Sequence, residues 1–200
     1  MSSPAVDRIE GSGLPLRGDN IDTDRIIPAR FLKAITFEGL GDHVFEDDRA
    51  AMPDHPFSNP AYQQARIILA NDNFGSGSSR EHAVWVLMES GIRAVIAPSF
   101  GPIFFVNSLK NGLLPLVIED DIAVRLRAEL HAAPGSEIAI DLERQEVAGP
   151  DGAIHGFDIA PAHRHRLLEG LDDIDLTLAH ESEITAFEKR HAAACGWLFP

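Results

Sequence analysis

The sequence Gly75-Ser76-Gly77-Ser78-Ser79-Arg80-Glu81-His82-Ala83 follows the apolar run Ile67-Ile68-Leu69-Ala70 and precedes the apolar segment Val84-Trp85-Val86-Leu87-Met88. Glycines, paired hydroxyl side chains and an arginine therefore lie where a strand is expected to pass into a helix. The first turn of a helix presents unpaired backbone N–H groups and a partial positive charge. The sequence thus predicts a strand, turn and helix with a site for a small anion at the turn.

The glycine-rich turn does not match the common nucleotide-binding or hydrolase motifs. The dinucleotide fingerprint needs a third glycine where this chain has Arg80, and a P-loop needs a lysine before a serine or threonine. A nucleophile elbow places glycines two residues on either side of a serine, and Ser76 lacks both. One structural alternative stays open, because Ser78 and Glu81 also have the spacing of a helix capping box, which requires no catalysis.

Short apolar strands alternate with helices through the centre of the chain. Strands are predicted at 66–70, 94–97 and 114–118, and helices at 79–90, 101–111 and 121–133. Gly91 and Gly112 stop the first two helices. Such alternation is typical of βαβ crossovers in a parallel sheet. Three later strands (137–142, 145–147 and 153–157) predict a small antiparallel set, and helices at about 161–169 and 181–194 follow. The expected fold class is α/β, with a mostly parallel sheet and flanking helices.

The first third of the chain is less regular. A polar leader precedes a predicted strand at 14–16, a loop of turn formers at 18–24 and a short extended piece at 26–28. From about 31 to 60, aromatic residues, acids, glycines and prolines follow one another without a period, which favours a binding loop or lid. We predict a single domain over 1–200, with this irregular loop at about 31–60 and a helical C-terminal tail at about 181–200.

Composition limits the possible partners of the chain. Its net charge of −14 disfavours nucleic acid and anionic membranes as partners. Cys195 is the sole cysteine of the 200 residues, so this chain alone cannot build a disulfide or a four-thiolate metal site. Metal chemistry would therefore have to come from a partner. The start of the chain lacks the basic and apolar regions of a signal peptide, and we expect a cytoplasmic protein.

Several segments together resemble the small-subunit family of bacterial 3-isopropylmalate dehydratase, from about Leu14 to Phe187. They are Asn20-Ile21-Asp22-Thr23-Asp24, the turn at 75–83, Ile96-Ala97-Pro98-Ser99-Phe100, Asn107-Ser108, Gly112-Leu113-Leu114-Pro115 and the segment 170–178. The resemblance implies the swivelling β/β/α domain of the aconitase type. It also implies a separate large subunit that carries a [4Fe–4S] cluster, so that this chain itself binds no cofactor.

The resemblance further implies a hydro-lyase reaction of leucine biosynthesis, in which 2-isopropylmalate and 3-isopropylmalate interconvert through isopropylmaleate. It carries the role of base over to Ser78, that of carboxylate clamp to Arg80, and that of a hydrogen-bond donor to Ser79. A serine is a poor base unless its alkoxide is stabilised, and the Gly77 backbone and Arg80 guanidinium offer a positive environment. Arginine suits a dicarboxylate substrate because its planar fork can bond both oxygens of a carboxylate.

Two further groups of residues are candidates for the site. The first matches the family's Asp-Thr-Asp loop and is expected to line the site, with stabilisation of a turn as the alternative: Asp22, Thr23 and Asp24. The second is expected to face the isopropyl group, with packing on the sheet as the alternative: Phe31, Leu32, Ile35 and Phe37.

Two other functions stay compatible with the sequence. One keeps the mechanism but changes the substrate to citramalate, dimethylmalate or homocitrate-like acids. The other is a non-catalytic module that binds an anion at the turn.

Overall fold

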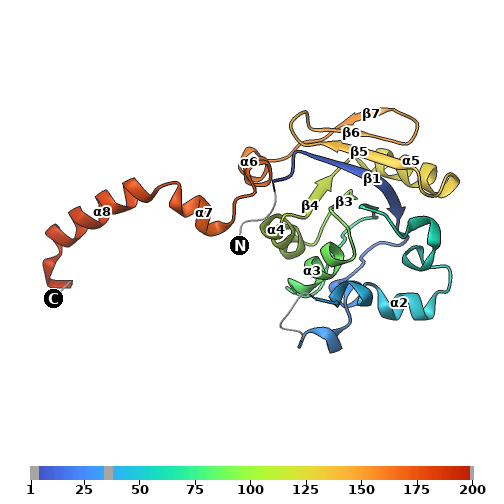
Figure 1. Cartoon of the computed structure of the whole chain (residues 1–200), viewed down its shortest axis with the longest axis horizontal. Helices are drawn as coiled ribbons and strands as arrows, with labels where there is room; N and C mark the ends of the chain where they lie inside the picture. Colours follow the sequence, from blue (N-terminus) through green and yellow to red (C-terminus); the bar gives the residue numbers. More distant parts are fainter. Residues whose placement is uncertain (1–4, 34–37, 199–200) are drawn as a thin grey trace.

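A computed structural model describes residues 5–33 and 38–198, and its described part contains a seven-stranded sheet in the order β4-β3-β2-β1-β5-β6-β7 (Figure 1). The strands are β1 (Arg8–Pro15), β2 (Ile67–Leu69), β3 (Ala94–Ala97), β4 (Leu114–Val117), β5 (Glu137–Asp141), β6 (Glu146–Ala148) and β7 (Ile154–Gly156). Strands β1 to β4 pair in parallel, whereas β1, β5, β6 and β7 pair antiparallel. The parallel strands and the antiparallel set that the sequence predicted are both present, and they share one sheet through β1.

Strand β1 is longer than predicted, because the polar leader forms its first half. Residues 8–12 pair with β5 and residues 13–15 pair with β2, so β1 belongs to both parts of the sheet. A Cβ atom at Gly13 would lie 2.5 Å from Leu130 of the helix above it. The glycine therefore lets that helix approach the strand closely, and it also makes the strand hard to recognise in the sequence.

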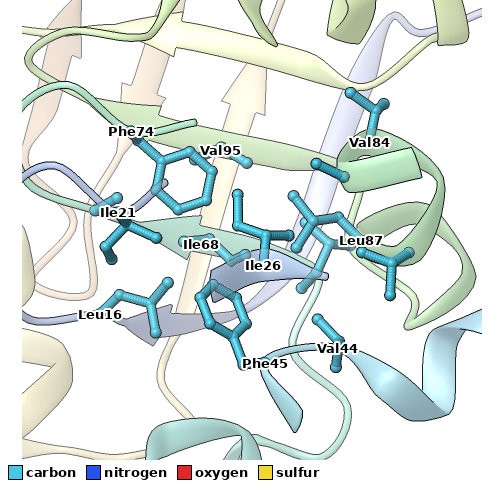
Figure 2. Packing of buried hydrophobic residues seen from close by; sticks show 14 of the residues in the cluster. Leu16, Ile21, Ile26, Val44, Phe45, Ile68, Phe74, Val84, Leu87 and Val95 are labelled. Atoms are coloured by element: carbon cyan, nitrogen blue, oxygen red, sulfur yellow. The ribbon is translucent and has the colours of Figure 1, made fainter. Parts of the chain in front are cut away.

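Eight helices are described, and those before α7 flank the sheet, with cores on both of its faces. They are α1 (Thr23–Ile26), α2 (Glu46–Ala51), α3 (His82–Glu89), α4 (Pro102–Asn111), α5 (Asp120–Ala132), α6 (Pro161–Glu169), α7 (Asp173–Leu178) and α8 (Glu181–Ala194). Successive residues of the central strands enter opposite cores, since Ile68 packs with α3 and Ile67 packs with α5. Figure 2 shows the first of these cores, where side chains from β2, β3, α1 and α3 meet around Ile68 and Ile26. The loop between β2 and α3 therefore rests on this buried cluster, to which its residue Phe74 belongs.

The structure differs from the sequence analysis at three places. The loop predicted at 18–24 ends in the short helix α1, because the Asp22 side chain accepts a hydrogen bond from the Arg25 N–H at 2.8 Å and caps it. Of the piece predicted to be extended at 26–28, Ile26 is the last residue of α1, and Ile27 is extended as predicted. The irregular stretch at 31–60 contains α2 and short 3₁₀ turns. Helix α7 was not predicted, although Asp172 and Asp175 form a reciprocal capping box at its start.

The chain ends in an extended arm, which we define as residues 173–198 with α7 and α8. Figure 1 shows this arm leading away from the body of the molecule. None of the residues of α7 or α8 is buried. Within the described ranges, no helix is long and apolar enough to cross a membrane.

Candidate active site

The glycine-rich turn after β2 lies directly against the Asp-Thr-Asp loop before α1. The Gly75 N–H donates to the Ile21 carbonyl at 2.7 Å, and the Thr23 N–H donates to the Ser76 carbonyl at 3.0 Å. Asp22 and Ser76 form an isolated parallel bridge between these bonds. The structure therefore brings together two segments that are more than fifty residues apart and that the sequence marked separately.

Thr23 fixes the backbone of Ser78. The Thr23 side chain is buried, with 1% of the residue exposed. Its Oγ1 atom accepts a hydrogen bond from the Ser78 N–H at 3.2 Å and donates one to the Ser78 carbonyl at 3.3 Å. Among the described residues, the Ser78 hydroxyl itself has no hydrogen-bond partner. Ser78 is thus held through its main chain, and none of the described residues engages its hydroxyl group.

Arg80 and Asp24 form an ion pair at the edge of the turn. The Arg80 side chain is 24% exposed and the Asp24 side chain is 53% exposed, so both can meet a ligand from solvent. Ser79 and Gly77 are exposed in the same turn. Gly77 has a φ angle of +91°, and a Cβ atom there would stand 3.4 Å from the Asp22 side chain. The structure therefore brings all seven predicted site residues together: six of them are at least partly exposed, and Thr23 is a buried support.

The predicted helix start at Ser79 is wrong, and so is the capping-box alternative. Helix α3 begins at His82, and the residue before it, Glu81, makes no side-chain cap. The Glu81 carboxylate instead accepts a hydrogen bond from the Asn111 side chain of α4 at 2.7 Å. Ser78 lies four residues before the helix and does not cap it. The first turn of α3 therefore lies beyond Ser78, and Arg80 is the cationic group nearest to Ser78 in the turn's sequence.

The first residues of α4 support the turn from behind. Gly75 has a φ angle of +75°, and a Cβ atom there would come within 2.2 Å of the Phe104 side chain. A Cβ atom at Gly101 would come within 2.4 Å of the Gly75 carbonyl oxygen. The Gly101 N–H also donates to the Phe74 carbonyl at 2.8 Å. Gly101 was not predicted to belong to the site, and a glycine directly before a helix that starts with proline was the available signal.

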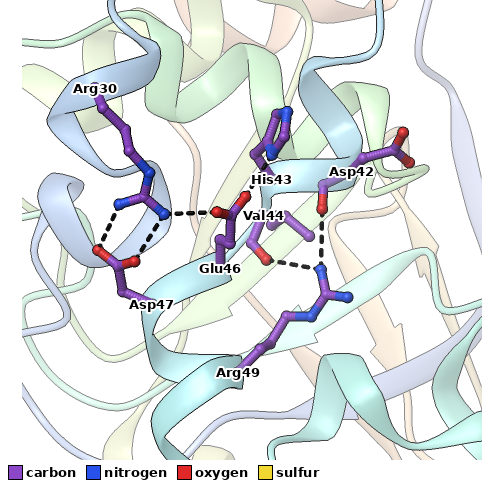
Figure 3. A network of polar contacts seen from close by, with 7 residues as sticks. All are labelled: Arg30, Asp42, His43, Val44, Glu46, Asp47 and Arg49. Atoms are coloured by element: carbon purple, nitrogen blue, oxygen red, sulfur yellow. Dashed lines mark hydrogen bonds and ion pairs between the residues drawn. The ribbon is translucent and has the colours of Figure 1, made fainter.

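A network of charged side chains ties the segment after α1 to α2 (Figure 3). Arg30 donates to both oxygens of Asp47, at 3.0 and 2.8 Å, and to Glu46 at 2.6 Å. Glu46 also contacts His43, and Arg49 donates to two main-chain carbonyls just before α2. Hydrogen bonds from Arg30 hold the pKa values of Glu46 and Asp47 below their usual range. The network thus joins residue 30 to residues 43–49, which lie on either side in sequence of the residues predicted to face the isopropyl group.

Two of the four residues predicted to face the isopropyl group, Ile35 and Phe37, lie outside the described residues. Phe31 is half-buried and packs against the core below the site. Its ring stacks on that of His43, with 3.9 Å between the ring centroids. Leu32 is also half-buried. For Phe31 the contacts therefore support packing, as the alternative interpretation held.

The fold and this site define a domain of the aconitase type. The family model described as the aconitase C-terminal domain matches residues 4–121. Two further models follow along the chain: one described as LeuD_N matches residues 124–161, and one described as the C-terminal domain of the 3-isopropylmalate dehydratase small subunit matches residues 173–200. The last of these coincides with the extended arm.

Proteins with known names give the same assignment. The 3-isopropylmalate dehydratase small subunit 1 of Bordetella parapertussis is 47% identical over 94% of this chain and 94% of its own length. The 3-isopropylmalate dehydratase small subunit of Gluconobacter oxydans is 48% identical over 90% of this chain and 89% of its own length. The crystal structure of a 3-isopropylmalate dehydratase (leuD) from Methanocaldococcus jannaschii superposes with a TM-score of 0.67 at 28% identity, over 90% of this chain and 99% of that one.

The chain therefore belongs to the small-subunit family of 3-isopropylmalate dehydratase. The predicted fold, family and hydro-lyase activity of leucine biosynthesis are confirmed. Within the described residues, no group of three or more histidine, cysteine and acidic side chains is arranged to hold a metal ion.

Proposed function

We propose that this chain supplies the base and a carboxylate clamp for the interconversion of 2-isopropylmalate and 3-isopropylmalate through isopropylmaleate. The observation that carries this proposal is the arrangement of Ser78. Its main chain is bonded on both sides to the buried Thr23 hydroxyl, while its own hydroxyl is unpaired among the described residues and lies two positions from Arg80. A nucleophilic or basic oxygen held in this way needs little reorganisation before it reacts.

Each residue of the site has a role in this proposal. Ser78 removes the proton from the carbon next to the leaving hydroxyl and returns it during rehydration. Arg80 binds a substrate carboxylate with both arms of its guanidinium. Ser79 and the Gly77 main chain donate hydrogen bonds to the same carboxylate. Asp24 holds Arg80 in place before substrate arrives, as their ion pair supports.

The remaining two residues of the Asp-Thr-Asp loop act as positioning residues. Thr23 sets the main chain of Ser78, as described above. Asp22 caps α1 through the Arg25 N–H and so fixes the loop that carries both neighbours. These contacts favour turn stabilisation for Asp22, while Asp24 is the member of the loop that a substrate could reach.

We further propose that the enzyme is completed by a large subunit with a [4Fe–4S] cluster and that the complex is cytoplasmic. The residues of this chain do not fit the cluster, since such clusters require three or four thiolates and Cys195, just beyond the end of α8, is the sole cysteine. When bound in the large subunit, the cluster would supply a Lewis acid for the departing hydroxyl. The net charge of −14 makes nucleic acid and membranes poor partners.

The substrate is proposed to be an isopropyl dicarboxylate. Leu32, with Ile35 and Phe37, provides apolar side chains close in sequence to the Asp-Thr-Asp loop. An apolar environment would leave the third carboxylate of a citrate-like acid unpaired, which is costly. Citramalate and dimethylmalate lack that third carboxylate, and they are the closest alternative substrates.

The test is co-expression with the large subunit of the same organism, anaerobic reconstitution, and comparison of rates on 2-isopropylmalate, citramalate and citrate. We expect 2-isopropylmalate to react fastest. We expect Ser78→Ala to lower kcat by about 10²- to 10⁴-fold, the usual contribution of a general base, while the complex still forms. Ser136→Ala is the matched control, since Ser136 is a half-buried serine between α5 and β5, away from the turn. Near-normal activity of Ser78→Ala, or a preference for citrate, would overturn the proposal.

A further inference from the structure

The C-terminal arm carries apolar side chains that its own chain does not cover. Ile174 is 67% exposed, Leu178 is 56% exposed and Phe187 is 56% exposed. Helix α8 has 14 residues and buries none of them. A helix of this length that packs against nothing is only marginally stable in water. The arm therefore has the character of a segment that is stabilised by another molecule.

The exposed side chains are spaced as in amphipathic helices. Ile174 and Leu178 are four residues apart on α7, and Ile184 and Phe187 are three residues apart on α8, so each pair lies on one side of its helix. His191 extends the same side of α8, and its ring stacks on Phe187 with centroids 5.5 Å apart. Each helix of the arm thus has one apolar side.

A second exposed apolar pair lies on α4, beside the root of the arm. Ile103 and Val106 are 50% and 47% exposed, and their spacing places them on the same side of α4 as Lys110. The Lys110 Nζ atom lies 3.2 Å from Asp173, the first residue of α7, which Arg166 of α6 also binds at 2.7 Å. These ion pairs fix the start of the arm against α4. We call the combined surface the α4–arm face, and it comprises Ile103, Val106, Ile174, Leu178, Ile184 and Phe187.

We propose that the α4–arm face is the docking surface for the large subunit of the enzyme. This inference rests on the proposed function, in which the site at Ser78 needs residues from that subunit. Helix α4 links the α4–arm face to the proposed site, because α4 begins at the residue after Gly101, which packs against the turn that carries Ser78. A partner that covers the turn would therefore also reach Ile103 and Val106.

Two observations favour the large subunit over a second copy of this chain. The net charge of −14 on each copy opposes self-association. The family model that matches the arm, residues 173–200, is described as a domain of the dehydratase small subunit, whereas the match to the general aconitase domain ends at residue 121. The arm thus belongs to the part of the chain that distinguishes a separate subunit from other aconitase-type domains.

The test measures the dissociation constant between purified small subunit and the large subunit of the same organism, without substrate. Val106→Glu and Phe187→Glu each place a carboxylate in the α4–arm face, and we expect each to weaken binding by at least about tenfold. Two controls add the same charge elsewhere. Ala186→Glu lies on the opposite side of α8, and Ile154→Glu replaces an exposed apolar side chain of β7. Both controls should stay within about twofold of wild type.

Unchanged binding of both Val106→Glu and Phe187→Glu would overturn the inference, as would equal weakening by the controls. Failure of the wild-type chain to bind the large subunit would also overturn it. Sedimentation of the free small subunit tests the alternative that the α4–arm face binds a second copy of this chain. A wild-type dimer that is dissociated by Phe187→Glu would assign the face to that second copy. The wild-type complex tests the proposed function by itself: if it forms through this face but does not convert 2-isopropylmalate, the docking inference stands and the proposed function falls.

Discussion

Replacing Gly101 by alanine tests whether the residue directly before α4 sets the position of the turn that carries Ser78. Gly101 has a φ angle of −58°, which alanine adopts without strain, so the substitution acts only through the added methyl group. That group would lie 2.4 Å from the Gly75 carbonyl oxygen, although real Cβ contacts are rarely closer than 3.4 Å. The obstacle is main chain and cannot rotate away. The turn or α4 must therefore move by about 1 Å, and overpacking of this kind costs about 1–3 kcal/mol.

The substitution should lower the catalytic rate as well as the stability. A displacement of about 1 Å in a catalytic group can lower the rate by about 100-fold. We therefore expect Gly101→Ala to lower kcat of the reconstituted complex by about that factor and to lower the melting temperature by roughly 2–12 °C. Gly156→Ala in β7 is the control, because a Cβ atom there meets nothing within 4 Å. Wild-type kcat and melting temperature for Gly101→Ala would refute the view that α4 positions the turn.

Three further outcomes follow from contacts at and near the site. Thr23→Val removes both hydrogen bonds to the Ser78 main chain, so it should lower kcat and reduce the free energy of unfolding in urea by about 1–3 kcal/mol. A variant with wild-type stability and activity would contradict the role of Thr23 as a support for Ser78. Asp24→Asn removes the charged group that holds Arg80 in place, so the KM for 2-isopropylmalate should rise by about two- to fivefold, and an unchanged or lower KM would contradict the positioning role of Asp24. Burial lowers the pKa of His55 below its usual value of 6.5. As the pH falls through that value, the unfolded chain therefore binds more protons than the folded chain, and the free energy of unfolding should decrease. Thermal melts from about pH 7.5 to 5.5 should show this slope, and His55→Gln should flatten it.

The sequence predicts the fold well where the local pattern and the tertiary structure agree. Strands β2 to β4 are short apolar runs separated by helices that end in glycine, and their positions were predicted to within a few residues. Strand β1 was largely missed, because Gly11 and Gly13 serve close packing and carry no side chain that could show a strand period. Helix α1 was missed because its start depends on one capping contact from Asp22.

The residues of the candidate site could be predicted, but their contacts could not. Ser78 and Glu81 have the spacing of a capping box, and only the structure shows that Ser78 is bonded to Thr23 and Glu81 to Asn111. Both partners are distant in sequence, so no local pattern contains them. The pairing of Arg80 with Asp24 is of the same kind. Local patterns and the family resemblance thus suggested the candidate residues, whereas tertiary contacts decided where α3 begins.

Helix α4 joins two tasks in one rigid element. It spans ten residues, or about 15 Å, with its first turn against Gly75 and its outward side in the surface proposed for the large subunit. A tilt of α4 during assembly would also move the turn that carries Ser78, because the first turn of the same unbroken helix packs against Gly75. If Ser78 acts as proposed, docking of the large subunit on α4 would also align the Ser78 hydroxyl with the substrate. A partner that fits poorly would then form a complex that binds but does not convert substrate.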